Sequence, residues 1–527
     1  MDVEASVPRP VSRRGFLFGA LSITSLTVLA ACGGGASQPT ATTAPAAAAP
    51  TKPAVATTAP ATAASPAATT TTVAAASPAT KPVASPAASP AASPAVAAAA
   101  SPSPATAGTG TGGPAAFTLA SPPAVPGAAA AKQYSGQKLT YYGDGVGLGN
   151  DIDKALAARF TQDTGIQVNV IPRPQSATDT FSQYQRFFQG QSADLDVMML
   201  DVIWPGSLGN NLLDLSPKLG DAAKQHFPNI IENNTVGGQL VGMPWFGDFG
   251  MLYYRTDLLQ KYGFSAAPKT WEELGQQAQK IMDGEKGSSP NFAGFVYQGN
   301  AYEGLTCNAL EWFASTGAGN FVDENNKVVV NNPQAVAVLN LLKGWVGTIS
   351  PRGVTGYQEE EARNAFQGGN AAFMRNWPYA YAAGVKDDSP VKGKFDVAPL
   401  PAAQGQKPVG TVGGWQLAVS KYSKSQDAAV EWVRYCTSPE IETYRAVVGT
   451  FVPTIPSVSQ NADVLKAMPF LKNLADVTRV TRPSRQFADQ YNEASTALFQ
   501  GVNQVLNGQD PAQVLPTVQQ RLERLLR

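Results

Sequence analysis

The fold of this chain is decided by the stretch Asp196-Val197-Met198-Met199-Leu200-Asp201, in which four apolar residues stand between two acids. A short apolar run without alternation is typical of a strand buried on both faces in the middle of a parallel sheet. Because open α/β sheets bind ligands beyond the carboxyl ends of their strands, Asp201 is a candidate binding residue. The alternative is a turn carboxylate that caps the next segment.

Upstream of this stretch, strand and helix signals alternate. Residues 138–142 and 167–171 have the composition of strands, and residues 151–163 place Ile152, Leu156 and Phe160 on one helical face before a stop at Gly165. Ser176 is a helix cap with an acid three residues later, and its helix extends to about residue 190. The resulting β-α-β-α-β order predicts a doubly wound α/β lobe.

Downstream, a second series of elements begins after a hairpin turn at Gly237-Gly238 and a turn at Pro244-Trp245. Thr256 is a plausible helix cap, and Thr270 opens a capping box with Glu273. Strands are predicted at residues 251–255, 371–375, 395–399 and 414–420, and helices at 302–315, 333–346, 425–437, 439–448, 486–506 and 511–526. The order predicts two lobes joined by several crossing strands, with residues 133–242 and about 378–430 in lobe 1 and residues 243–377 and about 431–527 in lobe 2.

The composition divides the chain further. Only 15% of its 527 residues are charged, against a usual value of about 25%. Residues 33–132 contain no Asp or Glu and are rich in Ala, Pro, Ser and Thr, which predicts a disordered linker. The N-terminal part also holds six of the 39 cations but two of the 39 anions, so the folded part is mildly acidic. No basic run is present, and nucleic-acid binding is not expected.

Several classes of chemistry find no support in the sequence. With one histidine, His226, and two cysteines beyond the N-terminal region, Cys/His zinc sites are excluded, and no nucleophile motif lies near His226. The glycines of residues 143–149 fit no G-x-G-x-x-G register, which argues against a nucleotide. We therefore expect neither an enzyme nor a cofactor.

The N-terminus has the features of an export signal. Arg13-Arg14 precedes an apolar run, residues 16–31, that is too short for a membrane span, and Leu29-Ala30-Ala31-Cys32 resembles a lipobox. Residues 1–32 therefore predict an exported lipoprotein held at the extracytoplasmic membrane face through Cys32. Phe18 replaces the lysine often found after a twin-arginine motif, so the Sec route stays open. Whether Cys307 and Cys436 form a disulfide also stays open, because sequence does not fix their distance.

Motifs along residues 133–527 resemble the extracellular solute-binding proteins of sugar ABC transporters, and most closely their trehalose/maltose-binding branch. The similar segments, in the family's order, are residues 201–205, 240–245, 252–259, 268–274, 366–374, 375–380, 413–415 and 438–440. The resemblance implies the class II periplasmic-binding-protein fold, with two doubly wound α/β lobes, a multi-strand hinge and a ligand cleft between the lobes. It also implies a monomer that delivers an oligosaccharide to a membrane permease driven by a cytoplasmic ATPase.

The same resemblance marks candidate ligand-binding residues. Carboxylates and arginine suit sugar hydroxyls, and aromatic rings suit the C–H faces of the ring. The candidates are Asp201, Asp248, Phe246, Trp377, Tyr379, Trp415, Arg482, Asp151 and Asp179. Asp248 follows the expected turn at Pro244-Trp245, and Phe246 stands where relatives have tyrosine, which would leave stacking without a hydrogen bond. The two residues Trp377 and Tyr379 are expected in a loop, and Arg482 is expected to reach the sugar from the second lobe.

Other functions remain open at this stage. An acidic, aromatic pocket also suits a polyamine, and Asp201 and Asp248 could serve a secreted glycosidase, although no glycosidase motif surrounds them. A sensor or adhesin with the same fold is a further reading. The sequence does not distinguish trehalose, maltose, sucrose or another α-glucoside.

Overall fold

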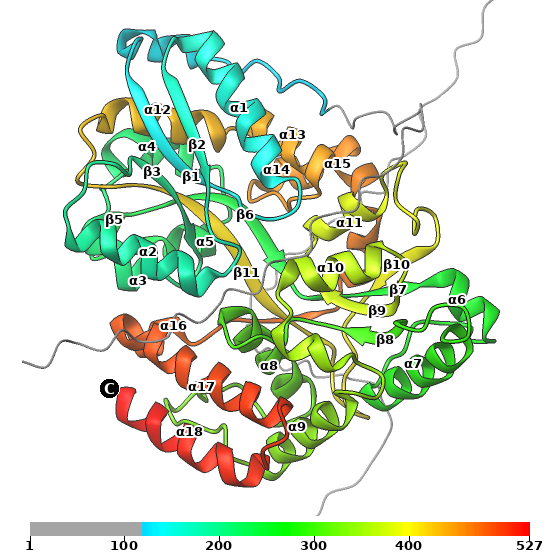
Figure 1. The fold of residues 1–527 in the computed structure, drawn as a ribbon. Coiled ribbons are helices and arrows are strands. Elements are labelled where there is room, and N and C mark those ends of the chain that lie inside the picture. Colours follow the sequence, from blue (N-terminus) through cyan, green and yellow to red (C-terminus); the bar gives the residue numbers. More distant parts are fainter. Residues whose placement is uncertain (1–118, 527) are drawn as a thin grey trace, which may run out of the picture. The chain divides into compact units, whose positions relative to one another are not determined.

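The computed structural model describes residues 119–526. The export signal with Cys32 and the linker up to residue 118 lie outside the described residues. Two mixed β-sheets with helices packed around them form the described part, and Figure 1 shows the long strand β11 (Val409–Val419) passing between its two halves. We call the elements around the first sheet the first lobe and those around the second sheet the second lobe; the residue boundaries predicted for the lobes stay a prediction.

The first sheet has six strands, with β3 (Val197–Asp201) near its centre. Its order is β12 (Thr478–Val480), β11, β3, β1 (Lys138–Gly143) and β2 (Gln167–Pro172), with β6 (Met243–Phe249) also paired to β11. Strand β1 runs parallel to both β2 and β3, whereas β11 runs antiparallel to β3. Residues 197–200 are each 0% exposed, which confirms the buried central strand predicted from the opening stretch.

The helices of the first lobe follow local sequence rules. Helix α1 (Gly149–Thr164) ends at Gly165, whose φ of 78° is the left-handed conformation that glycine adopts without strain. Helix α2 (Ala177–Gln189) is capped by the Ser176 hydroxyl, which accepts the N–H of Asp179. The other elements of this lobe are η1 (Ala128–Tyr134), α3 (Pro205–Leu208), η2 (Gly209–Asn211), α4 (Ser216–Ala223), α5 (Pro228–Asn233), β4 (Thr235–Val236), β5 (Gln239–Leu240), α12 (Gln426–Cys436) and α13 (Pro439–Gly449).

The second sheet has the order β10 (Phe395–Ala398), β7 (Met251–Arg255), β9 (Ala371–Asn376) and β8 (Ala293–Val296). The capping box predicted at Thr270 is present at the start of α7 (Trp271–Glu285). The remaining elements are α6 (Thr256–Lys261), α8 (Glu303–Ser315), α9 (Pro333–Trp345), η3 (Arg352–Gly356), α10 (Glu359–Gln367), α11 (Tyr379–Gly384), α14 (Pro456–Ser459), α15 (Ala462–Ala467), η4 (Pro469–Leu474), α16 (Ser484–Phe487), η5 (Ala488–Gln490), α17 (Tyr491–Leu506) and α18 (Pro511–Leu525).

The turn predicted at Pro244-Trp245 is wrong, because both residues belong to strand β6. Pro244 fits there since β11 is the one strand that pairs with β6, and the bridge on the other side of β6 lies three residues further on, at Gly247, so that no second strand needs the N–H that proline lacks. The register with β11 shifts between Trp415 and Gln416, so that Trp245 bulges out of the ladder. Asp248 therefore lies on a strand, and β6 continues through Gly250 into β7 of the second sheet.

Three further differences concern helix and strand ends. Thr256 is the first residue of α6 and not its cap, which is Arg255. The helix predicted over 486–506 begins at Tyr491, because Ala488 has a φ of 48° that interrupts the helical path. Strand β12 was not predicted, since its three residues are too few to produce a pattern.

The packed body begins earlier than the composition indicates. The predicted linker extends to residue 132, but Ala131 is 1% exposed and η1 packs against α1 and α12. The Tyr444 hydroxyl donates to the carbonyl oxygen of Ala120 at 2.7 Å, and Arg159 donates to that of Pro122 at 3.2 Å. These contacts depend on partners far away in the sequence, which composition does not register.

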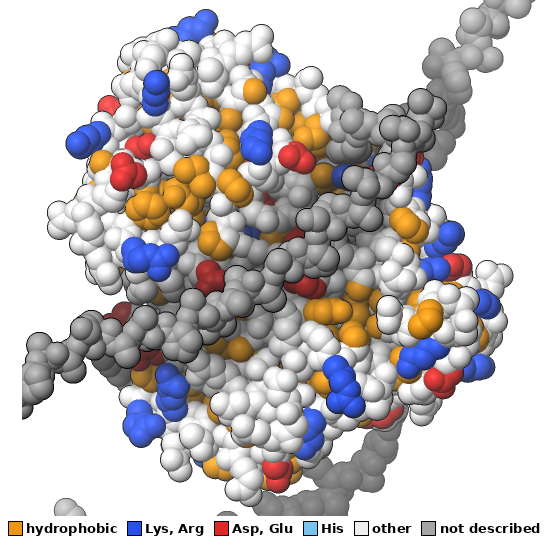
Figure 2. Space-filling model, viewed as in Figure 1, with side chains coloured by type: hydrophobic (Ala, Val, Ile, Leu, Met, Phe, Trp, Pro, Cys, Tyr) orange, Lys and Arg blue, Asp and Glu red, His pale blue; other side chains and the backbone are white. Residues whose placement is uncertain are grey.

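Other features of the described chain answer questions that the sequence leaves open. Cys307 and Cys436 are both free and buried. No helix within residues 119–526 is long and apolar enough to cross a membrane. On the face seen in Figure 2, the described Lys and Arg side chains lie singly or in small groups among Asp and Glu and form no single basic patch.

The single histidine belongs to a buried polar group in the first lobe. His226 Nδ1 lies 2.8 Å from the Thr454 hydroxyl and 3.5 Å from Glu442 Oε1. The Glu442 carboxylate accepts the N–H groups of Thr454 and Ile455 at 2.9 and 3.1 Å. Burial raises the pKa of Glu442 to about 7 and lowers the pKa of His226 to about 4. His226, Glu442 and Thr454 do not line the cavity described below.

This group predicts a pH dependence of stability. Folded Glu442 keeps a proton that the unfolded chain releases near its ordinary pKa, so its contribution to the free energy of unfolding is lost as pH rises from about 4.5 through 7. His226 acts oppositely, and its contribution is lost as pH falls from about 6.5 through 4. We expect Glu442→Gln to flatten the fall between pH 5 and 7 by up to about 1.4 kcal/mol per pH unit.

Urea denaturation of the wild type and the variant at pH 5, 6, 7 and 8 measures this slope. Asp153, whose pKa burial also raises to about 7, leaves a residual slope in the variant. The exposed Glu493→Gln is the control and keeps the wild-type profile. Parallel profiles of Glu442→Gln and the wild type would contradict the prediction.

Candidate functional site

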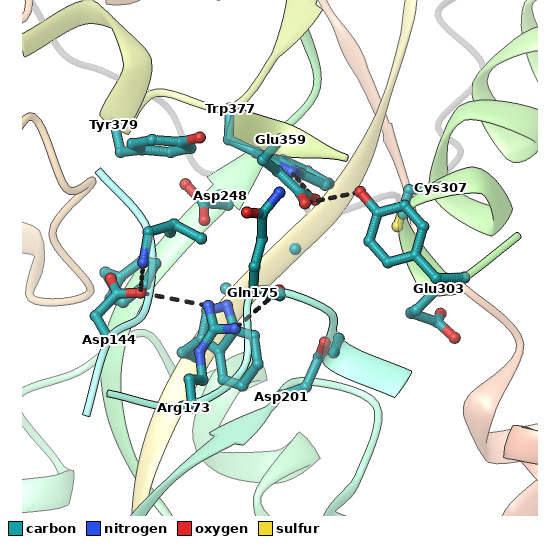
Figure 3. A pocket seen from close by; sticks show the side chains of 18 of the residues that line it. Asp144, Arg173, Gln175, Asp201, Asp248, Glu303, Cys307, Glu359, Trp377 and Tyr379 are labelled. Atoms are coloured by element: carbon teal, nitrogen blue, oxygen red, sulfur yellow. Dashed lines mark hydrogen bonds and ion pairs between the residues drawn. The ribbon is translucent and has the colours of Figure 1, made fainter. Parts of the chain in front are cut away.

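A cavity lies between the two lobes (Figure 3), and the empty space in and around it, open solvent included, is about 610 Å³. Its side chains come from both sheets and from the starts of several helices. The lining residues are Asp144, Val146, Arg173, Gln175, Ala177, Asp201, Phe246, Asp248, Tyr302, Glu303, Gly304, Cys307, Glu359, Trp377, Tyr379, Gly413, Gly414, Trp415, Phe451 and Arg482. The cavity is thus bounded by aromatic rings, carboxylates and two guanidinium groups.

One wall is a rung of three neighbouring strands in the first sheet. Trp415 on β11 stands opposite Asp201 on β3 and opposite Phe246 on β6. Residues directly opposite in antiparallel strands carry their side chains on the same face, so the three side chains form one surface. Asp248 lies two residues after Phe246 and points to the same face.

Two glycines make room for this wall. A Cβ on Gly413 would lie 3.1 Å from the Trp377 ring and 3.2 Å from Asp248 Cβ, both tighter than ordinary contacts. Gly414 has a φ of +118°, and a Cβ there would lie 2.6 Å from the carbonyl oxygen of Phe246. Only glycine satisfies both conditions at Gly414.

Each tryptophan of the cavity is backed by an arginine. The guanidinium of Arg173 lies 4.0 Å from the ring centre of Trp415, and that of Arg375 lies 3.9 Å from the ring centre of Trp377. Arg173 pairs with Asp144 at 3.3 Å, and Arg375 pairs with Glu311 at 2.5 and 2.9 Å. The cations fix the indoles through cation–π attraction, and Arg173 itself also lines the cavity.

Arg482 connects the two lobes at the cavity. Its guanidinium donates to Asp201 of β3 and to Glu303 at the start of α8, both at 2.9 Å. Glu303 also accepts the hydroxyl groups of Tyr491 and Ser495, each at 2.6 Å. Since Asp201 belongs to the first sheet and Glu303 to a helix of the second lobe, this ion-pair triad bridges the two lobes.

Two carboxylates of the cavity have no cation beside them in the described structure. Asp248 Oδ1 is buried without a hydrogen-bond partner among residues 119–526, and burial raises its pKa well above the ordinary value. Glu359 accepts the Tyr302 hydroxyl at 2.7 Å and the Trp377 ring N–H at 3.3 Å, and burial raises its pKa as well. Asp248 is therefore available to a hydroxyl or amine of a ligand.

Seven of the nine ligand-binding candidates from the sequence line this cavity, and two do not. The seven are Asp201, Phe246, Asp248, Trp377, Tyr379, Trp415 and Arg482. Asp151 is exposed in the first turn of α1, and Asp179 is exposed in the first turn of α2, where its N–H is used by the Ser176 cap. Both are acids at helix starts, a position that the helix dipole favours without any ligand.

The structure also adds lining residues that the sequence reading missed. Arg173 follows strand β2, and the strand-end rule applied to Asp201 would have found it. Glu303 and Glu359 are the first residues of α8 and α10 and have the pattern of ordinary helix-start acids. Phe451 follows α13 and carries no local signal. Within residues 119–526, no group of three or more His, Cys, Asp or Glu side chains is arranged to hold a metal ion.

Trp377 and Tyr379 were expected in a loop, but they lie at the end of a strand and at the start of a helix. Trp377 directly follows β9. Its backbone N–H donates to the Asn376 side chain at 2.8 Å, and its ring N–H donates to Glu359 at 3.3 Å. Tyr379 is the first residue of α11 and donates its hydroxyl to Glu360 at 2.7 Å. Both aromatic rings are thus held in place by polar contacts at their edges, which keeps them oriented toward the cavity in Figure 3.

Comparison with known proteins agrees with this geometry. The family described as bacterial extracellular solute-binding proteins matches residues 146–443. A probable ABC transporter-binding protein of Deinococcus radiodurans is 49% identical over 401 residues, which are 75% of this chain and 96% of the relative. The maltose-bound MalE3 structure of T. maritima is 37% identical with a TM-score of 0.69, and the match covers 74% of this chain and all of that one.

A further solved structure shares the fold at lower identity. It is an ABC transporter solute-binding protein from Agrobacterium radiobacter K84 in complex with ribitol, 24% identical with a TM-score of 0.65, and the match covers 74% of this chain and 99% of that one. These likenesses confirm the two-lobed class II fold predicted from the sequence.

Proposed function

The chain belongs to the family of bacterial extracellular solute-binding proteins, and from this premise we propose that it captures an oligosaccharide of the trehalose, maltose or sucrose type and delivers it to an ABC importer. One observation carries the sugar assignment: a cavity lined by two indoles, each with an arginine over its ring, together with carboxylates and guanidinium groups. Flat apolar rings suit the C–H faces of a pyranose, and charged groups suit its hydroxyls.

Delivery follows from closure of the lobes. When a sugar fills the cavity, the triad of Asp201, Arg482 and Glu303 joins the lobes, and the closed form presents a surface to the permease. The proteins of this family bind solutes and are not enzymes.

Isothermal titration of the purified protein tests the assignment. Maltose, trehalose, sucrose and glucose are the sugar probes, and spermidine tests the polyamine alternative that the acidic lining leaves open. We expect saturable binding of at least one disaccharide and none of spermidine. Binding of spermidine alone, or of no sugar, would overturn the sugar assignment.

Membrane attachment is the second part of the proposal. We infer that diacylglycerol on Cys32 anchors the protein to the outer face of the cell membrane, with residues 33–118 as the tether. A flexible chain of this length spans about 50 Å and an extended one roughly 270 Å, which allows the body to reach a permease. Cys32→Ser is expected to move the protein from the membrane fraction to the soluble fraction, and an unchanged distribution would exclude the anchor.

The Asp248→Asn variant is expected to bind the sugar more weakly but to be more stable than the wild type. A hydrogen bond between a neutral carboxyl group and a sugar hydroxyl contributes about 0.5–1.5 kcal/mol, so the variant is expected to bind the disaccharide about twofold to tenfold more weakly. The ligand-free protein at pH 8 is expected to be more stable than the wild type, because a buried carboxyl group with a raised pKa is replaced by a neutral amide. Titration and urea denaturation measure the two effects, with the exposed Asp476→Asn as control. Unchanged affinity would remove Asp248 from the site.

A further inference from the structure

Two phenylalanine rings form an apolar corner in the wall of the cavity. Phe246 of β6 is 4% exposed and Phe451, in the segment after α13, is 3% exposed. Their ring centres lie 4.7 Å apart at an interplanar angle of 58°. Both residues line the cavity, so a ligand that fills it contacts carbon atoms at this corner.

The backbone beside this corner is tied together by a hydrogen bond of its own. The N–H of Gly247 is donated to the carbonyl oxygen of Val452 at 2.9 Å, and this pair forms an antiparallel bridge between the two segments. The bridge holds Phe451 beside Phe246. Asp248 lies two residues away on the same strand face, and the other aromatic rings of the lining, Trp377, Tyr379 and Trp415, each carry an N–H or O–H group. The corner differs from them because both of its rings are hydrocarbon only.

The corner is also rigid. The Arg445 guanidinium lies behind it, 4.9 Å from the ring centre of Phe246 and 4.2 Å from that of Phe451. Arg445 is 1% exposed, stacks on Trp245 at 3.4 Å and donates to the Trp245 carbonyl oxygen at 3.1 Å. A cation held by three aromatic rings prevents the two phenylalanines from turning away when a ligand enters.

We propose that Phe246 and Phe451 are specificity-determining residues that select a sugar with no free hydroxyl at the position facing them, such as a deoxygenated or O-methylated carbon. The inference rests on the proposed function and refines its substrate class. A hydroxyl buried against this corner loses its hydrogen bonds to water without replacement, whereas a C–H or methyl group gains contact area. Phe451 acts with Phe246 because both rings touch the same volume.

The test is a scan of maltose in which each hydroxyl in turn is removed or methylated, with titration of each analogue. In the wild type we expect one position at which an analogue binds at least threefold more tightly than maltose, and losses of tenfold or more at positions that face the carboxylates. A site that hydrogen-bonds a hydroxyl rejects the analogue that lacks it, so the scan maps the corner directly.

Variants then assign the effect to the two rings. Phe246→Tyr and Phe451→Tyr each add a hydroxyl to the corner and are expected to reverse the preference in favour of maltose, whereas Phe246→Leu remains apolar and keeps the preference at lower affinity. The inference is overturned if no analogue binds as tightly as maltose, or if both tyrosine variants keep the preference of the wild type. In either case the proposed function stands. If neither maltose, trehalose nor sucrose binds, the proposed function fails and the inference with it.

Discussion

Replacing Arg482 by alanine is expected to abolish sugar binding and to lower the free energy of unfolding by about 3–5 kcal/mol. The guanidinium is 5% exposed and is the shared partner of Asp201 and Glu303, each at 2.9 Å. Without it, two carboxylates face each other in the closed cleft. Their repulsion opposes lobe closure, so binding is lost for an electrostatic reason in addition to the loss of stability.

Urea denaturation and titration with the disaccharide measure the two effects. The control is Arg485→Ala, three residues away, whose ion pair with Glu232 has the same N–O distance of 2.9 Å but side chains that are 61% and 71% exposed. Exposed pairs contribute at most about 1 kcal/mol, so this variant is expected to bind normally. A double variant of Arg482→Met with Glu303→Gln removes one of the stranded charges and is expected to recover part of the stability. If Arg482→Ala had the same free energy of unfolding as the wild type, the role of the triad would be contradicted.

Replacing Gly414 by alanine is expected to lower the free energy of unfolding by about 2 kcal/mol or more and to weaken sugar binding at least tenfold. The φ of +118° is strained for any residue with a side chain, and the new Cβ would lie 2.6 Å from a backbone oxygen of β6. Relief requires β11 and β6 to separate where Trp415 and Phe246 are neighbours. The wall that Trp415 and Phe246 form would shift as a result.

The matched control is Gly220→Ala in helix α4. A Cβ on Gly220 has no atom within 4 Å, and its φ is not positive. Alanine is the better helix former by about 1 kcal/mol, so this variant is expected to be slightly more stable and to bind normally. Equal effects of the two glycine replacements would show that Gly414 has no special role.

Local rules predicted most of the secondary structure. The apolar run before Asp201 became the buried central strand β3, and Ser176 and Thr270 cap their helices as their neighbours indicated. These features depend on residues within one turn or one strand, so the sequence contains the whole interaction. The failures, at Pro244-Trp245 and at β12, occurred where pairing with β11 overrides local preference.

In the candidate site, too, local sequence patterns predicted some residues and only packing decided the others. Aromatic and charged residues at strand ends, such as Trp377 and Asp201, were found because the fold places strand ends at the cleft. Asp151 and Asp179 were misplaced, and Glu303 and Glu359 were missed, although all four are acids in the first turns of helices. Their sequence patterns are the same, and only the packing of the helices decides which of them reach the cavity.

The sequence by itself determined the alternation of strands and helices, the acidic body behind a sparsely charged N-terminal segment, and a family resemblance specific enough to name seven of the lining residues. The tertiary structure alone decided that Arg482 joins Asp201 to Glu303, that Arg173 lies over the ring of Trp415, and that Phe451 completes an apolar corner. A hydrophobic pattern reports which face of an element is buried, but not what packs against it. Contacts between residues more than a hundred positions apart depend on sheet register and lobe closure, which no local pattern encodes.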